Sequence, residues 1–312
     1  MNFRDIRWAA AVSAVMIITV PFVLLPLRPA VWLGGKLGLC LYMILGKWRK
    51  VGFESLSASL PYLCSQKEWD QGLSSPDQIA RNLFINIGRL VAELSRLYHG
   101  LDRSLLDTVE FRGMEHYWQA KARGKGILFI TAHSGNWELL ALAFGARFDP
   151  VAVVARPMKK QYIDKILEKM RSHHGNRVIY RDQAVREILT ELKGNGNVGI
   201  LVDQVAPPQH GIVVDFLGRP AWTTRIPVKL AMKSQAALLP IFIHREQWRN
   251  IITIHPEVKL EDVSQADAVR TYTSRLNHYI EQHIIRYPDQ WNWLYRRWKG
   301  TKGLSLVEQG RI

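Results

Sequence analysis

Short apolar runs alternate with amphipathic stretches along most of this chain from residue 126 onward. Runs of about five apolar residues bounded by glycine or polar residues are typical of buried strands, and longer stretches with apolar residues three and four apart are typical of helices. The predicted strands are Ile127–Thr131, Val151–Ala155, Arg177–Tyr180, Val198–Val202, Ile212–Phe216, Leu238–His244 and Ile251–His255. The predicted helices are Pro76–Leu101, Trp137–Phe148, Tyr162–His173, Ala184–Lys193, Thr223–Ser234 and one from Ala266 that ends before Pro288. This order predicts an α/β fold with a mixed, mostly parallel sheet and helices on both faces.

The first fifty residues are apolar in a different way. Trp8–Leu27 has no charged residue, and about 20 apolar residues are what a helix needs to cross a bilayer core. Pro21 and Pro26 interrupt this stretch, so a re-entrant or interfacial hairpin with the second apolar stretch, Val31–Gly46, is an alternative to a single span. A buried helical hairpin is the third interpretation. We predict a membrane anchor over residues 1–50 and one folded domain over residues 51–312.

The charge of the chain indicates its partners. It carries 42 Lys and Arg against 27 Asp and Glu, a formal net charge of +15, which favours nucleic acid, an anionic bilayer or an acidic protein or phosphorylated substrate. Lys47, Arg49 and Lys50 follow the apolar segment, and this bias predicts that the folded domain faces the cytoplasm. The two cysteines, Cys40 and Cys64, form no C-x-x-C motif, which fits a reducing compartment and no cysteine-based metal site.

Polar residues follow the first four predicted strands. In open α/β sheets, binding sites lie beyond the carboxyl ends of the parallel strands. The residues at these ends are His133, Arg156, Arg181 and Asp182, and Asp203 and Gln204. We therefore expect the site among them, although Arg156 could be a surface arginine and Asp203 a turn residue.

His133 and Glu138 form an H-x-x-x-x-E pattern where the first strand gives way to a helix. With Ser134, Gly135 and Asn136 as turn or N-cap residues, Glu138 falls in the first helical turn and could reach a ring nitrogen of His133. A carboxylate that orients a histidine produces a general base for a hydroxyl group. The alternative is that Glu138 merely favours the helix N-terminus and that His133 is an ordinary loop histidine.

Several motifs in a fixed order resemble one family. They are K-W-R-K at Lys47–Lys50, T-A-H-S-G-N-W-E at Thr131–Glu138, V-D-Q at Val202–Gln204, F-L-G at Phe216–Gly218 and P-D-Q-W-N-W-L-Y-R-R-W-K at Pro288–Lys299. This set is similar to the bacterial lipid A biosynthesis acyltransferases of the H-x4-D/E superfamily. The F-P-E-G-T-R block of the glycerolipid branch is absent from the sequence, which disfavours a lysophosphatidic acid acyltransferase.

The resemblance implies a specific reaction. Such enzymes move a fatty acyl chain from acyl carrier protein to a hydroxyl group of a lipid A precursor, and His133 and Glu138 match their base and orienting residue. No metal or redox cofactor is required. The resemblance also implies an enzyme on an anionic membrane surface, at the cytoplasmic face of the bacterial inner membrane, with no nucleic-acid partner.

Further residues are assigned to substrate binding. We expect backbone N–H groups of Ser134–Asn136, or the Arg156 side chain, to stabilise the oxyanion, and Asp203 and Gln204 to organise the site. Thr223 would cap a helix whose first turn holds Arg225, a phosphate-binding arrangement or a plain capped surface helix. The tail residues Trp291, Trp293 and Trp298 would lie at a membrane interface or in the core.

Other functions remain open from the residues alone. A basic, non-catalytic membrane scaffold and a nucleic-acid binder both fit the charge. Within the acyltransferases, the acceptor could instead be a mannoside, an ornithine lipid or a lysophospholipid.

Overall fold

The computed structural model describes residues 17, 19–69, 75–158, 161–180, 184–260, 265–301 and 303–304. The first half of the predicted span Trp8–Leu27 lies outside these residues, and so do Arg181 and Asp182. The boundary predicted at residue 50 stays a prediction.

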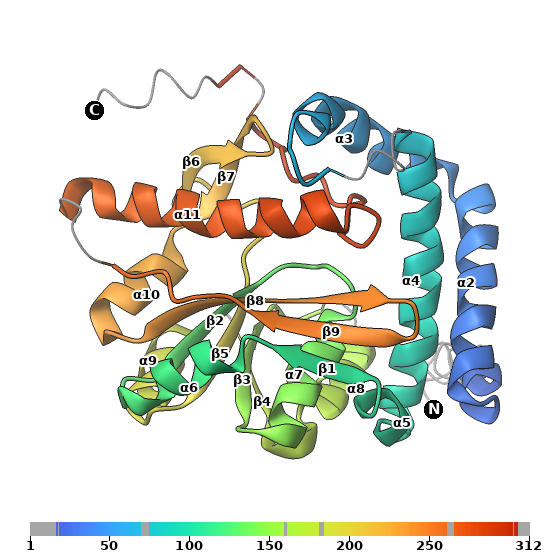
Figure 1. Cartoon of the computed structure of the whole chain (residues 1–312), viewed down its shortest axis with the longest axis horizontal. Helices are drawn as coiled ribbons and strands as arrows, with labels where there is room; N and C mark the ends of the chain where they lie inside the picture. Colours follow the sequence, from blue (N-terminus) through green and yellow to red (C-terminus); the bar gives the residue numbers. More distant parts are fainter. Residues whose placement is uncertain are drawn as a thin grey trace, which may run out of the picture.

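A seven-stranded sheet forms the centre of the fold (Figure 1). Its strands are β1 (Val109–Arg112), β2 (Ile127–Thr131), β3 (Val151–Ala155), β4 (Arg177–Tyr180), β5 (Asn197–Leu201), β8 (Ala237–Glu246) and β9 (Arg249–Ile254), in the order β1-β9-β8-β2-β5-β3-β4. The β8–β9 pair is antiparallel, and every other neighbouring pair is parallel. A separate antiparallel hairpin consists of β6 (Gly211–Phe216) and β7 (Arg219–Thr224). The prediction of a mixed, mostly parallel sheet is confirmed.

Helices cover both faces of this sheet. The helices of the described chain are α2 (Leu27–Ile44), α3 (Gly46–Cys64), α4 (Pro76–Tyr98), α5 (Arg103–Leu106), α6 (Met114–Ala122), α7 (Trp137–Arg147), α8 (Gln161–Arg171), the 3-10 helix η1 (His173–Gly175), α9 (Ala184–Lys193), α10 (Ile226–Ser234) and α11 (Gln265–Arg286). Leu128 and Ile130 of β2 pack with α9, α10 and α11, whereas Ile127 and Phe129 pack with α6, α7 and α8. Because successive side chains of a strand point to opposite faces, the apolar β2 run fills two cores.

Two short strands were not predicted from the sequence, and several boundaries moved. β1 has only four residues and β7 contains a proline, so neither shows a clear strand pattern. The helix predicted from Thr223 begins at Ile226, because Thr223 is a buried residue of β7. The strand predicted from Ile251 begins at Arg249, and Gln247 and Trp248 form the turn before it, since Glu246 pairs with Arg249.

Helices α2 and α4 stand side by side across one end of the sheet (Figure 1). They approach closely at glycines: a Cβ atom at Gly38 would lie 2.1 Å from the carbonyl oxygen of Phe84, and one at Gly34 would lie 2.5 Å from that of Gly88. Backbone contact at this distance requires residues without side chains. Gly34 and Gly38, one turn apart on α2, therefore form a helix-packing surface.

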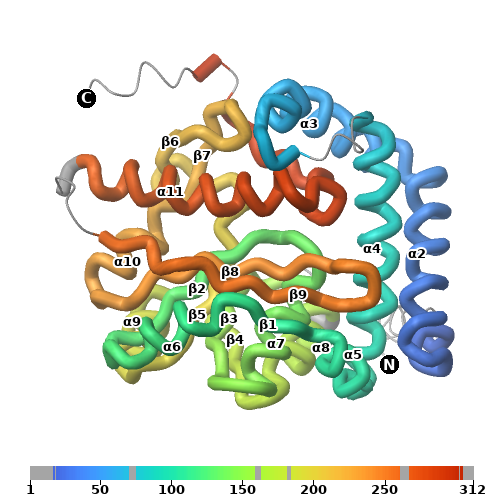
Figure 2. Tube along the Cα trace, in the orientation of Figure 1, coloured from blue at the N-terminus to red at the C-terminus, as the bar shows by residue number. Residues whose placement is uncertain are grey.

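The bend between α2 and α3 is 91°. In the described part of the chain, no single helix has the length and apolar character to cross a membrane, although α2 and α3 reach that threshold as a bent pair. Figure 2 shows this N-terminal pair reaching the segment that follows α11, and Gly52 of α3 lies against Leu294. Helix α3 therefore packs against the segment that follows α11.

Candidate active site

The His133 ring is held by Asp203, at the carboxyl ends of two neighbouring strands. Strands β2 and β5 are paired in parallel, with Thr131 opposite Leu201. Each reactive side chain lies two residues beyond this pair, and the His133 Nδ1 atom is 2.7 Å from Asp203 Oδ1. The sheet order therefore brings together two groups that are 70 residues apart in the chain.

Three donors converge on the Asp203 carboxylate. Its Oδ2 atom accepts from the His133 backbone N–H at 2.9 Å and from the Trp291 indole N–H at 2.8 Å. Burial alone would raise the pKa of Asp203, but the adjacent charge of His133 and these hydrogen bonds lower it. The carboxyl group is consequently ionised and accepts a hydrogen bond from the Nδ1–H group of His133.

The other ring nitrogen is available as a base. Because Nδ1 carries the proton in the neutral ring, Nε2 has the free lone pair, and it lies 3.3 Å from the amide nitrogen of Gln204, an exposed residue. Burial opposes protonation of His133, but the charge and hydrogen bond of Asp203, together with the charge of Glu138, outweigh it and raise the pKa of the ring. An incoming hydroxyl group would replace the Gln204 amide at Nε2.

The loop after His133 is fixed by the C-terminal segment. The carbonyl group of His133 accepts from the Asn292 N–H, and the Gly135 N–H donates to the Gln290 carbonyl, both at 3.0 Å. Gly135 has a φ of +56°, and a Cβ atom there would lie 2.5 Å from the carbonyl oxygen of Ile243. The buried Ser134 hydroxyl bonds to His283 Nε2 at 2.9 Å. Because the Gly135 N–H is bonded and the Ser134 N–H donates to Ala132, these two groups do not form the predicted oxyanion site.

Glu138 is not a hydrogen-bond partner of either ring nitrogen of His133, which pair with Asp203 and Gln204, so this part of the predicted geometry is wrong. Its carboxylate instead forms two hydrogen bonds with Arg171 of α8, at 2.8 and 2.5 Å, and accepts from the Trp137 indole at 3.2 Å. The Trp137 ring meets the His133 ring edge to face, with centroids 5.2 Å apart. Glu138 therefore positions Arg171 and Trp137 near His133, while Asp203 forms the hydrogen bond with the ring itself.

Loss of the Glu138 charge should destabilise the protein. In a Glu138→Gln variant, Arg171 would remain largely buried without its partner, and we expect the free energy of unfolding to fall by about 3–5 kcal/mol. Thermal unfolding followed by circular dichroism measures this change. The double variant Glu138→Leu/Arg171→Met is the control, because removing both charges should recover part of the loss. Equal stability of wild type and Glu138→Gln would contradict the assigned role.

Asn136 begins α7 and connects it to a buried ion pair. Its Oδ1 atom accepts from the Leu139 N–H at 3.0 Å, and its amide donates to Glu93 of α4 at 2.9 Å. Glu93 is 1% exposed and pairs with Arg245 of β8. The predicted capping role of Asn136 is confirmed. Its hydrogen bond with Glu93 connects the candidate site to α4.

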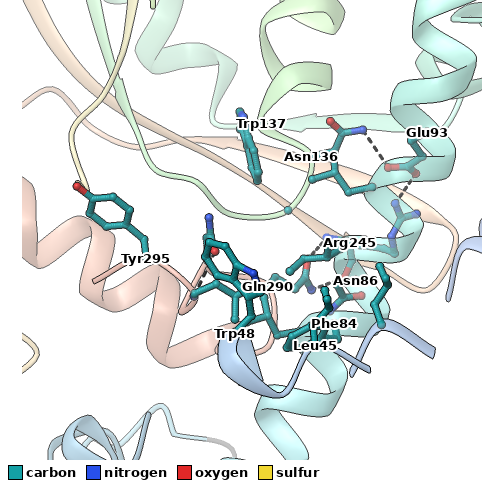
Figure 3. Close-up of a pocket in the computed structure, with 17 residues that line it drawn as sticks. Leu45, Trp48, Phe84, Asn86, Glu93, Asn136, Trp137, Arg245, Gln290 and Tyr295 are labelled. Atoms are coloured by element: carbon teal, nitrogen blue, oxygen red, sulfur yellow. Dashed lines mark hydrogen bonds and ion pairs between the residues drawn. The ribbon is translucent and has the colours of Figure 1, made fainter. Parts of the chain in front are cut away.

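An apolar cavity of about 410 Å³ lies against this network (Figure 3). The Gly135–Trp137 loop forms part of its wall, and Glu93 and Arg245 form another part. Most of the remaining lining comes from α4, from the α2–α3 bend and from the C-terminal segment, including Leu83, Ile87, Leu90, Leu45, Trp48 and Leu294. Trp137 touches both the cavity and the His133 ring, so the cavity adjoins the candidate base.

Two predicted binding residues are not brought to His133 by hydrogen bonds. Arg156 is exposed at the end of β3, which β5 separates from β2. Arg225 immediately precedes α10 and donates to the carbonyl group of Gln209. The arrangement with Thr223 as a helix cap is wrong, because its hydroxyl accepts from Arg297 and Asn277 inside the β7 packing.

The tryptophan-rich tail belongs mainly to the core. Trp291 and Trp293 are 1% and 0% exposed, and Trp298 packs partly buried against the same core. Arg297 is fully buried over the Phe216 ring, because its planar guanidinium can stack on an aromatic face while it donates to the Trp222 carbonyl group and the Thr223 hydroxyl. The interpretation of Trp291 and Trp293 as interfacial residues is therefore wrong.

Sequence reasoning missed Arg171, Glu93 and Arg245. Glu93 did carry a signal, since it lies one turn after Leu90 and one turn before Leu97 on the apolar face of α4. A charged residue on such a face needs a buried partner. Arg171 and Arg245 show no local pattern, because their partners come from distant segments.

Comparisons with known proteins identify the relatives of this chain. A family model described as bacterial lipid A biosynthesis acyltransferase matches residues 10–300. A lipid A biosynthesis acyltransferase of Haemophilus influenzae is 23% identical over 92% of this chain and 86% of its own length. A lipid A biosynthesis lauroyltransferase of Escherichia coli is 27% identical over 69% of the chain and 70% of its own length. A phosphatidylinositol mannoside acyltransferase of Mycolicibacterium smegmatis is 26% identical over 72% and 73%.

Proposed function

The chain belongs to the bacterial lipid A biosynthesis acyltransferase family, and on that premise we propose that it transfers a fatty acyl chain from acyl carrier protein to a hydroxyl group of a lipid A precursor. It is an O-acyltransferase. The observation that carries the finer proposal is the His133–Asp203 pair beside an apolar cavity, at the carboxyl end of the sheet. In this arrangement the His133 base lies next to a cavity that can hold an acyl chain.

The reaction follows from the orientation of the His133 ring. Nε2 accepts the proton of the acceptor hydroxyl while the hydroxyl oxygen attacks the thioester carbonyl carbon. Asp203 stabilises the imidazolium that forms. The carbon–sulfur bond then breaks, and His133 returns the proton to the departing thiolate. Donor and acceptor thus exchange one acyl group for one proton.

Charge that develops on the carbonyl oxygen needs donors. The first N–H groups of a helix have no partner within the helix, and the helix dipole favours negative charge there. Helix α7 begins at Trp137, beside the His133 ring. We assign the oxyanion to the free N–H groups at this helix start, in place of Ser134 and Gly135.

The apolar cavity is the proposed site of the acyl chain. Its leucine and isoleucine lining, with Phe84 and Trp48, offers no charged group along α4 until Glu93. Burial of methylene groups here would contribute about 0.8 kcal/mol for each group. The polar Glu93–Arg245–Asn136 end would then lie toward the reacting thioester.

Exposed apolar side chains on α2 and α3 support attachment to a membrane surface. Met43 and Ile44 are 64% and 75% exposed, and Trp32, Trp48 and Phe53 are also exposed. The cations Lys36, Lys47 and Lys50 are exposed on the same helices. Apolar residues flanked by cations are the pattern of a helix in an anionic interface. We propose the cytoplasmic face of the bacterial inner membrane as the location.

The double variant Met43→Glu/Ile44→Glu should bind vesicles less tightly. Two exposed apolar side chains would become charged, so we expect the partition onto phosphatidylethanolamine–phosphatidylglycerol vesicles to fall at least about tenfold. Co-sedimentation measures the bound fraction. The control is Val185→Glu/Met232→Glu, which changes exposed apolar residues of α9 and α10. An equal loss in both double variants would reject the α2–α3 surface.

Product analysis tests the proposed function. Purified protein would receive acyl-loaded carrier protein or acyl-coenzyme A, together with a lipid A precursor, and mass spectrometry would detect the acylated product and its acyl length. We expect the carrier-bound donor to be preferred at low salt, because the carrier is acidic and the chain has a net charge of +15. A donor preference that does not change with salt concentration would contradict the electrostatic part of the proposal.

A second acceptor is supported by the mycobacterial relative. That protein is named as a phosphatidylinositol mannoside acyltransferase, and its identity of 26% is similar to the 27% of the lauroyltransferase. The same assay with a phosphatidylinositol mannoside acceptor separates the two candidates. Transfer to the mannoside alone would replace the lipid A precursor as the proposed acceptor.

A further inference from the structure

A second cavity, of about 860 Å³, shares a wall with the apolar one. Glu93 and Arg245 line both cavities. The second cavity lies at the carboxyl end of β8, between the start of α2, the start of β1 and the turn that joins β8 to β9. It therefore occupies the same edge of the sheet as His133, since β8 and β2 are parallel neighbours.

Charged groups in this cavity are balanced. Among its described lining residues, four carry carboxylates and four carry guanidinium groups. Several of them pair with one another, as Arg112 does with Glu110 and Glu246. A site dedicated to phosphate would hold an excess of cations, whereas sugar hydroxyl groups both donate and accept hydrogen bonds and need donors and acceptors together.

Trp248 gives the cavity an aromatic surface. It lies in the two-residue turn between β8 and β9 and is 45% exposed, and the Arg28 guanidinium is 5.8 Å from its ring centroid. A partly exposed indole can pack against the apolar face of a sugar ring while neighbouring charged groups bind its hydroxyls. Neither core packing nor sheet pairing requires an exposed ring at this turn.

Asn250 adds an unsatisfied polar atom. This lining residue is 1% exposed, and its side-chain nitrogen donates to Thr108 at 3.1 Å. Its Oδ1 atom is buried and has no hydrogen-bond partner among the described residues. Buried acceptors are normally satisfied, so this unpaired atom, on a residue that lines the cavity, marks an incomplete polar network at the cavity wall.

We propose that this polar cavity binds the carbohydrate headgroup of a glycolipid acceptor. The inference rests on the proposed function, because it names where the acceptor is held. Glu93 connects the polar cavity to the candidate site. It forms an ion pair with Arg245 in the cavity wall, and it accepts a hydrogen bond from Asn136, which begins α7 next to His133. The sugar and the acyl chain would lie on the two sides of the Glu93–Arg245 wall, with the reacting groups near its end.

Binding of a lipid-free sugar tests the cavity directly. The probe is a β-1,6-linked glucosamine disaccharide, and saturation-transfer NMR with the full chain measures its affinity, with glycerol 3-phosphate as the non-sugar comparison. We expect Trp248→Ala to weaken disaccharide binding about tenfold and Trp248→Phe to restore most of it. Trp118→Ala is the matched control, because Trp118 is 51% exposed on α6 and lines neither cavity. Equal affinities in wild type and Trp248→Ala would overturn the inference.

A turnover assay separates this inference from the proposed function. The ratio of kcat/KM for a glycolipid acceptor to that for a monoacylglycerol acceptor should fall about tenfold in Trp248→Ala. If the wild type acylates the glycolipid and this ratio is unaffected, the cavity assignment is wrong and the function stands. If the wild type acylates no acceptor but Trp248-dependent disaccharide binding persists, the cavity stands and the function is wrong.

Discussion

Replacement of His133 by alanine is expected to lower kcat for acyl transfer by about 10²- to 10⁴-fold. The variant lacks the Nε2 atom that accepts the hydroxyl proton, while the cavity walls and the α7 helix start remain. Binding of the acyl donor should therefore persist, and the loss should fall on kcat and not on KM. Release of the donor thiol, followed with a thiol-reactive dye in the presence of acceptor, measures this rate.

The matched control is His278→Ala on α11, whose side chain is 65% exposed. This variant should retain wild-type turnover, which would show that removal of an exposed histidine does not by itself lower activity. Near wild-type turnover in a folded His133→Ala protein would exclude the general-base mechanism. It would leave the family assignment intact, because that assignment depends on the match over residues 10–300.

Replacement of Asp203 by asparagine is expected to cost about 10²- to 10⁴-fold in kcat/KM, although the shape of the side chain is kept. An amide can donate to Nδ1 and thereby move the ring proton to Nε2, which then has no lone pair for the acceptor hydroxyl. It also withdraws the charge that stabilises the imidazolium. Glu115→Gln is the control, because this carboxylate is 66% exposed on α6.

The pH dependence provides an independent measurement of the same pair. The base must be neutral, so activity should be lost as the pH falls through the pKa of His133. Burial lowers that pKa, but the charge and hydrogen bond of Asp203 and the charge of Glu138 together raise it, so the acid limb of kcat/KM in the wild type should have its midpoint above the ordinary histidine value of about 6.5. In Asp203→Asn the main influence that raises this pKa is lost while burial still lowers it, so the limb should move to lower pH. An unmoved limb would show that Asp203 does not control the titration of the ring.

The candidate site shows where prediction from sequence works and where it stops. His133, at the end of a five-residue apolar strand, could be found because strand ends mark sites in α/β sheets. The sequence pattern favours Glu138 as its partner, because Glu138 is near His133 in the chain. The structure gives that role to Asp203, since β5 and not β3 is the neighbour of β2. Strand order depends on how the helices and crossover connections pack, so no local sequence pattern predicts it.

The sequence by itself determined the α/β class, most strands and helices, and the family, because apolar periodicity and the short motifs are local properties of the chain. Only the tertiary structure decided that Asp203 holds His133, that Glu138 pairs with Arg171, and that Trp291 is a buried donor rather than an interfacial residue. It also decided that Glu93 and Arg245 separate an apolar cavity from a polar one. The physical reason is the same in each case: a buried charge or polar group is stable only beside its partner, and each of these partners comes from another segment of the fold.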